Sequence, residues 1–108
     1  MTIKEPAIIV YCTCPDAQVA EQLAAGLLEK RLAACINIVS GVTSHYLWQG
    51  KLEKEAEHLL LIKSTNRCYS ALEEDIKKMH PYELPEIIAV PIDRGSPEYI
   101  QWIQESVS

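Results

Sequence analysis

The sequence predicts an α+β fold in which strands and helices alternate in the order βαββαβ, followed by a C-terminal helix. Two observations indicate this order. Residues 19–32 and 69–79 repeat apolar side chains at helical spacing, whereas the other apolar runs are rich in residues that strands favour. No repeat, low-complexity tract or linker divides the chain, so residues 1–108 are expected to form a single domain.

The first half of the chain is expected to form a strand, a helix and an unusually long strand. Ala7 to Cys14 is β-prone, and Pro15-Asp16 supplies the proline and the acid expected in the first turn of a helix. The apolar stripe of that helix is made of Val19, Ala20, Leu23, Ala24, Leu27, Leu28 and Leu32. A second strand begins near Ala34 and runs to Trp48, about 14 residues that span on the order of 45 Å. Most strands are less than half as long, so its tip is expected to project beyond the domain.

The second half begins with the return of this strand as a hairpin. Gln49-Gly50 is a turn signal, and Lys51 to Ser64 is expected to pair with the second strand. Asn66 is the expected cap of a second helix, which His80-Pro81 ends because the residue before a proline is pushed out of the α region. The stripe of this helix is formed by Tyr69, Leu72, Ile76 and Met79.

The last elements complete a recognisable topology. Glu86 to Ile92 is expected to form the fourth strand, and Ser96-Pro97-Glu98 to open a short final helix. This order is the split βαβ or ferredoxin-like pattern, whose antiparallel sheet has the strand order 4-1-3-2. The first and fourth strands point apolar side chains to both faces, but two helices cover only one. The uncovered face and the projecting hairpin, with Tyr46, Leu47 and Trp48 near its tip, therefore predict self-association.

Composition excludes several classes of partner. The chain has 10 basic and 15 acidic residues and a formal net charge of -5, and no basic cluster exceeds Lys77–Lys78. Nucleic-acid binding is therefore not expected. The first residues lack the apolar core of a signal peptide, and the longest aliphatic run, 59–62, is too short to span a bilayer. These features predict a cytoplasmic protein with no membrane partner, whose cysteines are free thiols or soft metal ligands.

The sequence also lacks the common catalytic motifs. It contains no GxSxG nucleophile elbow, no GxGxxG after a strand and no P-loop lysine motif. Asp16, Asp75 and Asp93 are scattered, and no acid/base pair stands out. We therefore do not expect an enzyme.

The predicted topology brings several metal-ligating residues together. The end of the first strand should lie beside the start of the fourth, which places Cys12 and Cys14 near His80, Tyr82 and Glu86. Thiolate and imidazole suit copper in either oxidation state, or zinc. The structural alternative is equally concrete: cysteines are often buried in the core, His80 would be a helix C-terminal residue, and Glu86 a solvated strand end.

Two segments resemble the CutA divalent-cation tolerance proteins. They are Ala33 to Ser44, followed by Tyr46, Trp48, Gly50 and Lys51, and His80-Pro81-Tyr82-Glu83-Leu84-Pro85-Glu86. The resemblance covers essentially the whole chain. It implies a ferredoxin-like homotrimer, similar in architecture to PII signalling proteins and linked to tolerance of copper and other divalent cations. It also implies copper binding by Cys12, His80 and Glu86. Met79 stands where some members have a second histidine, and its thioether suits Cu(I).

Three functions remain open at this point. The first is a metal-binding trimer that uses Cys12, His80 and Glu86. The second is a PII-like signalling trimer that binds a small anion or metabolite between subunits, near Lys63, Arg67 and Tyr82. The third is a structural or scaffold trimer.

Overall fold

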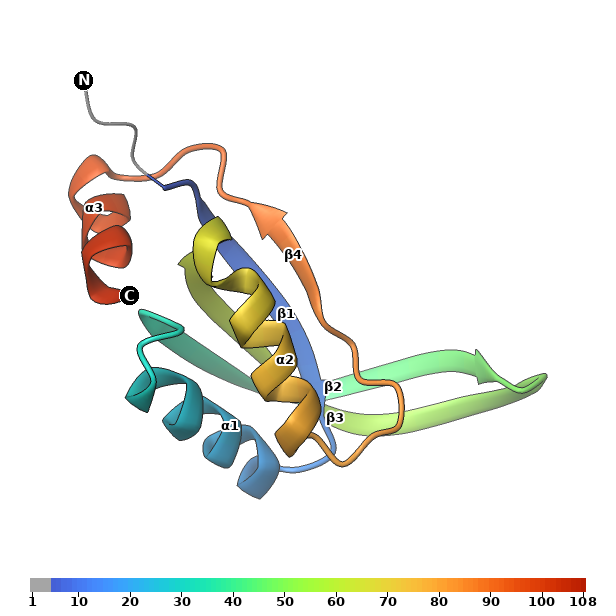
Figure 1. The fold of residues 1–108 in the computed structure, drawn as a ribbon. Coiled ribbons are helices and arrows are strands. Elements are labelled where there is room, and N and C mark those ends of the chain that lie inside the picture. Colours follow the sequence, from blue (N-terminus) through green and yellow to red (C-terminus); the bar gives the residue numbers. More distant parts are fainter. Residues whose placement is uncertain (1–4) are drawn as a thin grey trace.

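The computed structural model describes residues 5–108, which form one four-stranded sheet and the helices that pack on it. The elements are β1 (Ala7–Cys14), α1 (Ala17–Glu29), β2 (Cys35–Trp48), β3 (Lys51–Thr65), a 3-10 turn (Asn66–Cys68), α2 (Tyr69–Met79), β4 (Ile88–Pro91) and α3 (Pro97–Ser106). All pairs in the sheet are antiparallel, in the order β2-β3-β1-β4. In Figure 1, α1 and α2 lie side by side on one face of this sheet. The predicted fold and strand order are confirmed.

Two helices begin at the residues that the sequence indicates. The side chain of Asp16 accepts a hydrogen bond from the backbone N–H of Val19 at 2.8 Å, which caps α1. Ser96 caps α3 by accepting from the N–H of Tyr99 at 3.4 Å. Among residues 5–108, no helix is both long enough and apolar enough to cross a bilayer.

Two predicted boundaries are wrong. Asn66 does not cap α2 through its side chain, because the chain leaves β3 directly into a 3-10 turn that runs into the helix. β4 covers Ile88–Pro91 rather than 86–92, because it is an edge strand that pairs only with β1, between Ile8 and Tyr11. One backbone bond to β1 continues beyond the strand, since Ile92 donates its N–H to the carbonyl of Ala7 at 3.0 Å.

The core lies between α1, α2 and one face of the sheet. Alternation along β1 sends the even-numbered side chains to this face, where they meet the even-numbered residues of β3. The core side chains include Ile8, Val10, Cys12, Cys14, Ala20, Leu23, Leu27, Leu60, Ile62, Leu72 and Ile76. The two cysteines of β1 are thus the last members of a continuous row of core residues.

The opposite face of the sheet is not covered by α1 or α2; Tyr99 of α3 reaches Lys63 on this face, but other parts of it expose apolar side chains. Ile88 and Val90 of β4 are 54% and 40% exposed, and Val39 of β2 is 41% exposed. The register places Ile88 opposite Tyr11 and Val90 opposite Ile9, so these side chains share one face. We call this surface the open face.

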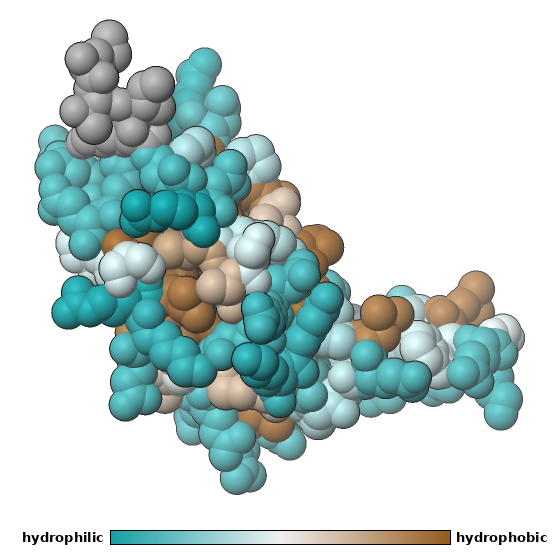
Figure 2. Space-filling model, in the orientation of Figure 1, coloured by the Kyte–Doolittle hydropathy of each residue, from teal (hydrophilic) through white to brown (hydrophobic). Residues whose placement is uncertain are grey.

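The β2–β3 hairpin continues well beyond the helices as an arm. The ladder runs from Val42 opposite Glu57 to Trp48 opposite Lys51, after a register shift between Val39 and Val42. The arm gives the molecule an elongated shape, with extents of 53 × 26 × 22 Å. Figure 2 shows brown, apolar side chains along an otherwise hydrophilic arm, and Leu47 and Leu52 are 72% and 76% exposed.

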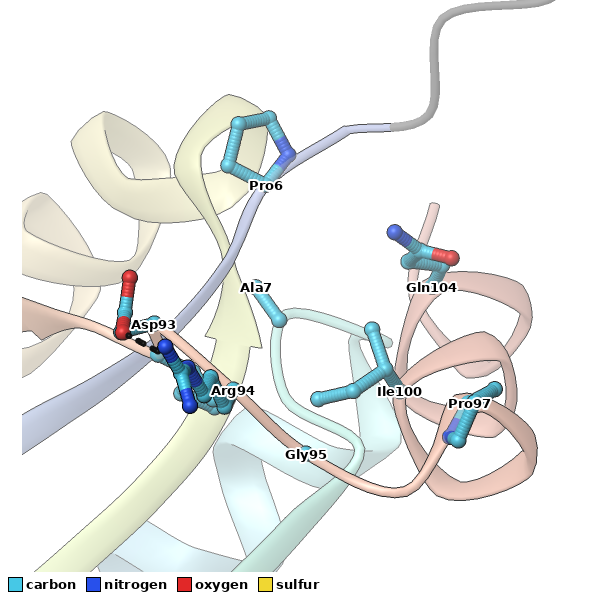
Figure 3. A pocket seen from close by; sticks show the side chains of 9 residues that line it. Pro6, Ala7, Asp93, Arg94, Gly95, Pro97, Ile100 and Gln104 are labelled. Atoms are coloured by element: carbon cyan, nitrogen blue, oxygen red, sulfur yellow. Dashed lines mark ion pairs between the residues drawn. The ribbon is translucent and has the colours of Figure 1, made fainter.

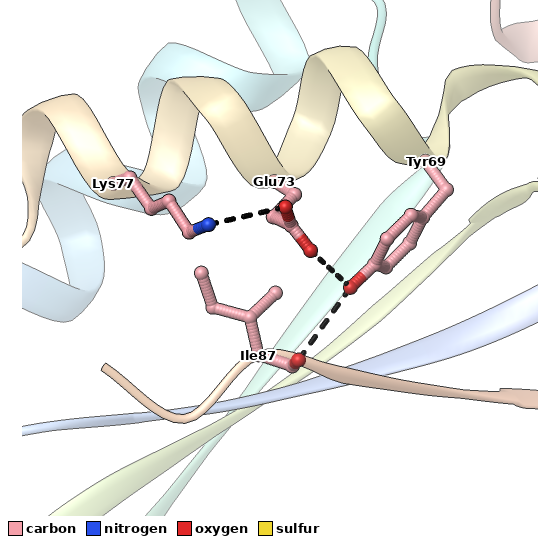
Figure 4. A network of polar contacts seen from close by, with 4 residues as sticks. All are labelled: Tyr69, Glu73, Lys77 and Ile87. Carbon is pink, nitrogen blue, oxygen red and sulfur yellow. Dashed lines mark hydrogen bonds and ion pairs between the residues drawn. The ribbon is translucent and has the colours of Figure 1, made fainter. Parts of the chain in front are cut away.

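A polar network ties α2 to the segment before β4 (Figure 4). The hydroxyl of Tyr69 donates to Glu73 at 2.8 Å and lies 3.5 Å from the carbonyl oxygen of Ile87, while Lys77 pairs with Glu73 at 3.2 Å. Burial, followed by the hydrogen bond to Glu73, raises the pKa of Tyr69 to about 12. The free energy of unfolding should therefore depend on pH above the range where an unfolded tyrosine ionises.

We predict that Tyr69→Phe lowers the free energy of unfolding by about 1 kcal/mol near neutral pH, because one hydrogen bond is lost. This deficit should shrink as the pH rises from about 10 toward 12, because Tyr69 loses its proton first in the unfolded state and wild type therefore loses a stabilising contribution that the variant does not have. Urea unfolding of both proteins across this range measures the difference. A deficit that stays constant up to pH 12 would contradict the raised pKa.

Candidate metal centre

The candidate site lies at the C-terminal end of β1. Cys12 and Cys14 are two residues apart in β1, so both thiols point to the helix-covered face, and both are fully buried. In the ladder with β3, Cys12 lies opposite Leu60 and Cys14 lies opposite His58. The two sulfurs therefore sit at the end of the core, next to the start of the arm.

The C-terminal end of α2 brings an imidazole to the same place. His80 follows the last residue of the helix, and its backbone N–H donates to the carbonyl of Ile76 at 2.8 Å. Its ring is buried, and ligand atoms of Cys12, Cys14 and His80 lie within 4.8 Å of one another. Among residues 5–108, these three form the one group of three or more Cys, His, Asp or Glu residues whose ligand atoms lie this close together, and all three residues are buried.

Both ring nitrogens of His80 already have hydrogen-bond partners. Nε2 lies 2.8 Å from the carbonyl oxygen of Thr13, and Nδ1 accepts from the backbone N–H of Tyr82 at 3.1 Å. A carbonyl can only accept and an N–H can only donate, so these partners fix a neutral imidazole that is protonated on Nε2. The ring of Tyr82 packs 4.7 Å from that of His80, centroid to centroid, which further fixes its orientation.

The two thiols differ in acidity because they lie next to each other in different surroundings. The thiol of Cys12 donates to the carbonyl oxygen of Thr13 at 3.8 Å, and interaction with the Cys14 thiol, followed by burial, raises the pKa of Cys12. Interaction with Cys12 lowers the pKa of Cys14, against the opposing effects of burial and of the Glu57 carboxylate. Cys14 is thus the first of the pair to become a thiolate, which is the form that binds metals.

Glu86 lies apart from this buried cluster. Its side chain is exposed, on the loop between α2 and β4, and it is not among the residues whose ligand atoms meet. It lines a hollow of about 1050 Å³ together with Glu53, Glu55, Glu57, Glu83, Tyr46, Trp48 and Tyr82. Its charge acts on Cys12 only as a minor contribution to the raised pKa. The structure brings Cys12 and Cys14 close to His80, as the topology predicts, whereas Glu86 is not a member of this group.

The residues suggested for an anion pocket do not gather around one hollow of this chain. Tyr82 lines the acidic hollow and donates to the buried Glu57 at 2.9 Å. Lys63 instead lies 3.3 Å from the hydroxyl of Tyr99, and Arg67 is exposed in the 3-10 turn. The carboxylates around Tyr82 would repel an anion at that position.

A second hollow, of about 620 Å³, lies where α3 approaches the segment after β4 (Figure 3). Its charged lining residues, Asp93 and Arg94, form an exposed pair with atoms 3.6 Å apart. A side chain at Gly95 would collide with Ile100, so the hollow owes its shape to close packing there. It contains no group of metal-ligating side chains.

A sequence model of the CutA1 divalent ion tolerance protein family matches residues 8–106. The chain belongs to this family. It is 47% identical over 98 residues to the divalent-cation tolerance protein CutA of Thermus thermophilus, covering 91% of this chain and 95% of that protein. It is 46% identical over 97 residues to a CutA homolog of Xenopus laevis, covering 90% of this chain but 64% of that protein. The chain is 44% identical to protein CutA of Mus musculus and spans 57% of the length of that protein.

Solved structures of the family have the same fold. The Thermus thermophilus divalent cation tolerance protein superposes with a TM-score of 0.93 at 45% identity, covering 94% of this chain and 99% of that one. CutA1 from Oryza sativa gives a TM-score of 0.94 at 41% identity, covering 97% and 96%. At these identities the chain resembles the two solved proteins in sequence as well as in fold.

Proposed function

We propose that this family member contributes to divalent-cation tolerance by binding copper directly at the buried cluster of Cys12, Cys14 and His80. The observation that supports this most strongly is the meeting of two thiols and an imidazole within 4.8 Å at the end of the core. We infer that the protein acts by binding rather than by catalysis.

The chemistry of these donors fits a soft metal ion. Thiolate sulfur selects Cu(I), and imidazole suits copper and zinc. With metal–sulfur bonds of about 2.3 Å, ligand atoms in a three-coordinate site lie roughly 4 Å apart, which modest side-chain rotations can supply here. When bound, Cu(I) would take the place of the two thiol protons and offset one of the two thiolate charges. Cys12 and Cys14 would be its anchoring ligands.

The open face supports a proposal of self-association. Ile88, Val90 and Val39 leave an apolar surface that a second copy of the chain would cover, and the arm could reach past the edge of one subunit. Resemblance to the family favours a homotrimer. A cytoplasmic location remains part of this proposal, since a reducing compartment keeps Cys12 and Cys14 as thiols.

The two other functions are less well supported. A PII-like trimer that binds an anion would need a basic pocket, whereas Tyr82 lines a hollow with Glu53, Glu55 and Glu57. A scaffold trimer requires only the open face and leaves the clustering of Cys12, Cys14 and His80 without a role.

The first test removes the thiols. We predict that wild type binds one Cu(I) per chain in competition with bicinchoninate under anaerobic conditions, and that Cys12→Ser/Cys14→Ser loses this binding. Cys35→Ser is the matched control, because Cys35 lies at the start of β2, opposite Lys63 and remote from the cluster. Glu86→Gln should also bind as wild type. Equal binding by wild type and the double variant would refute the site.

The second test concerns assembly. Val90→Lys places a charge on the open face and is expected to convert the trimer to smaller species in light scattering, because a lysine there is poorly accommodated between apolar surfaces. Leu84→Lys is the control, since Leu84 is 71% exposed on the loop before β4 rather than on the sheet. A trimer that survives Val90→Lys would exclude this part of the open face from the interface.

A further inference from the structure

The two histidines near the thiols differ in one respect. Both nitrogens of His80 are engaged, with the Thr13 carbonyl at 2.8 Å and the Tyr82 N–H at 3.1 Å. In contrast, Nδ1 of His58 is buried and has no hydrogen-bond partner. Buried nitrogens without partners are uncommon in native proteins, so each one points to a missing ligand, water or ion.

The sheet register places His58 next to the thiols. His58 of β3 lies directly opposite Cys14 of β1, so the two side chains leave the sheet on the same face, with Cβ atoms roughly 4.5–5.5 Å apart. Cys12 lies opposite Leu60 and is therefore the diagonal neighbour of His58 on that face. The ligand atoms of His58 are not among those that already meet within 4.8 Å, so the His58 ring would have to turn toward the two sulfurs to share a metal with them.

We propose that His58 supplies the imidazole ligand of the copper site, through Nδ1 and alongside Cys12 and Cys14. His80 then keeps its hydrogen bonds and acts as a positioning residue that holds the Thr13 carbonyl and the loop at Tyr82. This inference rests on the proposed copper binding by Cys12 and Cys14, and it replaces His80 by His58 as the imidazole ligand of that site.

The difference in hydrogen bonding explains why His58 is the better ligand. To bind a metal, His80 must give up at least one buried hydrogen bond and leave the Thr13 carbonyl or the Tyr82 N–H without a partner. His58 loses no hydrogen bond through Nδ1, and a metal there would satisfy the unpaired nitrogen. His58 is also half-buried, whereas Cys12, Cys14 and His80 are buried, so it offers an entry route from the surface.

The resulting donor set has two sulfurs and one nitrogen, which suits Cu(I). Each thiol would release its proton as a sulfur–copper bond forms, and the lone pair of Nδ1 would form the third bond. The copper remains in the +1 state throughout, so no oxidant or reductant is required. Three soft or borderline donors in an enclosed site are typical of Cu(I) rather than of the harder divalent ions.

The most direct test follows the histidine side-chain nitrogens by long-range proton–nitrogen NMR, with and without Cu(I), which is diamagnetic. We expect the Nδ1 resonance of His58 to shift on adding Cu(I). The resonances of His80 should keep the pattern of one protonated and one unprotonated nitrogen, and those of the exposed His45 should not move. A shift at His80 with none at His58 would overturn the proposal.

Variants provide an independent readout. His58→Val should weaken Cu(I) binding on the order of 10- to 100-fold in competition with bicinchoninate. The metal-free variant should melt at or above the wild-type temperature, because it removes an unpaired buried nitrogen and places a strand-favouring residue in β3. His45→Val, on the exposed part of the arm, is the matched control and should bind as wild type.

These results separate the two proposals. If wild type binds Cu(I), the thiol variants do not, and His58→Val binds as tightly as wild type, copper binding stands and the role of His58 is refuted. If wild type fails to bind Cu(I), the proposed function itself fails and the role of His58 fails with it.

Discussion

The register between β1 and β3 is the constraint on which the rest of the structure depends. Because Cys14 pairs with His58 and Ala7 with Thr65, the even-numbered residues of both strands share the face beneath α1 and α2. This single register assembles the core row, ends that row with two thiols and places an imidazole across from the last one. A slip of one strand by one residue would turn its core side chains to the open face and separate the thiols from the histidine.

The thiols reconcile two demands that usually conflict. A buried metal site needs polar ligands, but a core without metal must not leave charges unpaired. Protonated cysteines behave as small apolar side chains, so Cys12 and Cys14 can pack beside Leu60 when no metal is bound. Interaction with Cys12 lowers the pKa of Cys14, and the thiolate is the form of a cysteine that binds a metal. His80 contributes by fixing the loop that closes the site, through the Thr13 carbonyl and the Tyr82 N–H.

The sequence was sufficient for the order of elements and for the proximity of Cys12 to His80, because periodicity and topology determine both. The sequence was insufficient where the local backbone conformation determines where an element begins or ends. Asn66 has the side chain of a cap, but the chain enters a 3-10 turn instead. β4 begins two residues later than expected, at Ile88, and pairs with only part of β1, from Ile8 to Tyr11. His58 could not be recognised from pattern alone, since its importance depends on an exact pairing partner and on a nitrogen that lacks one.

X-ray absorption at the copper edge of the Cu(I)-loaded protein tests the central claim most directly, because it identifies the atoms bonded to the metal. A first shell of two sulfurs at about 2.3 Å and one nitrogen is the result expected for a site anchored by Cys12 and Cys14. A first shell made of nitrogen and oxygen alone would contradict it, and would place any bound copper outside the core.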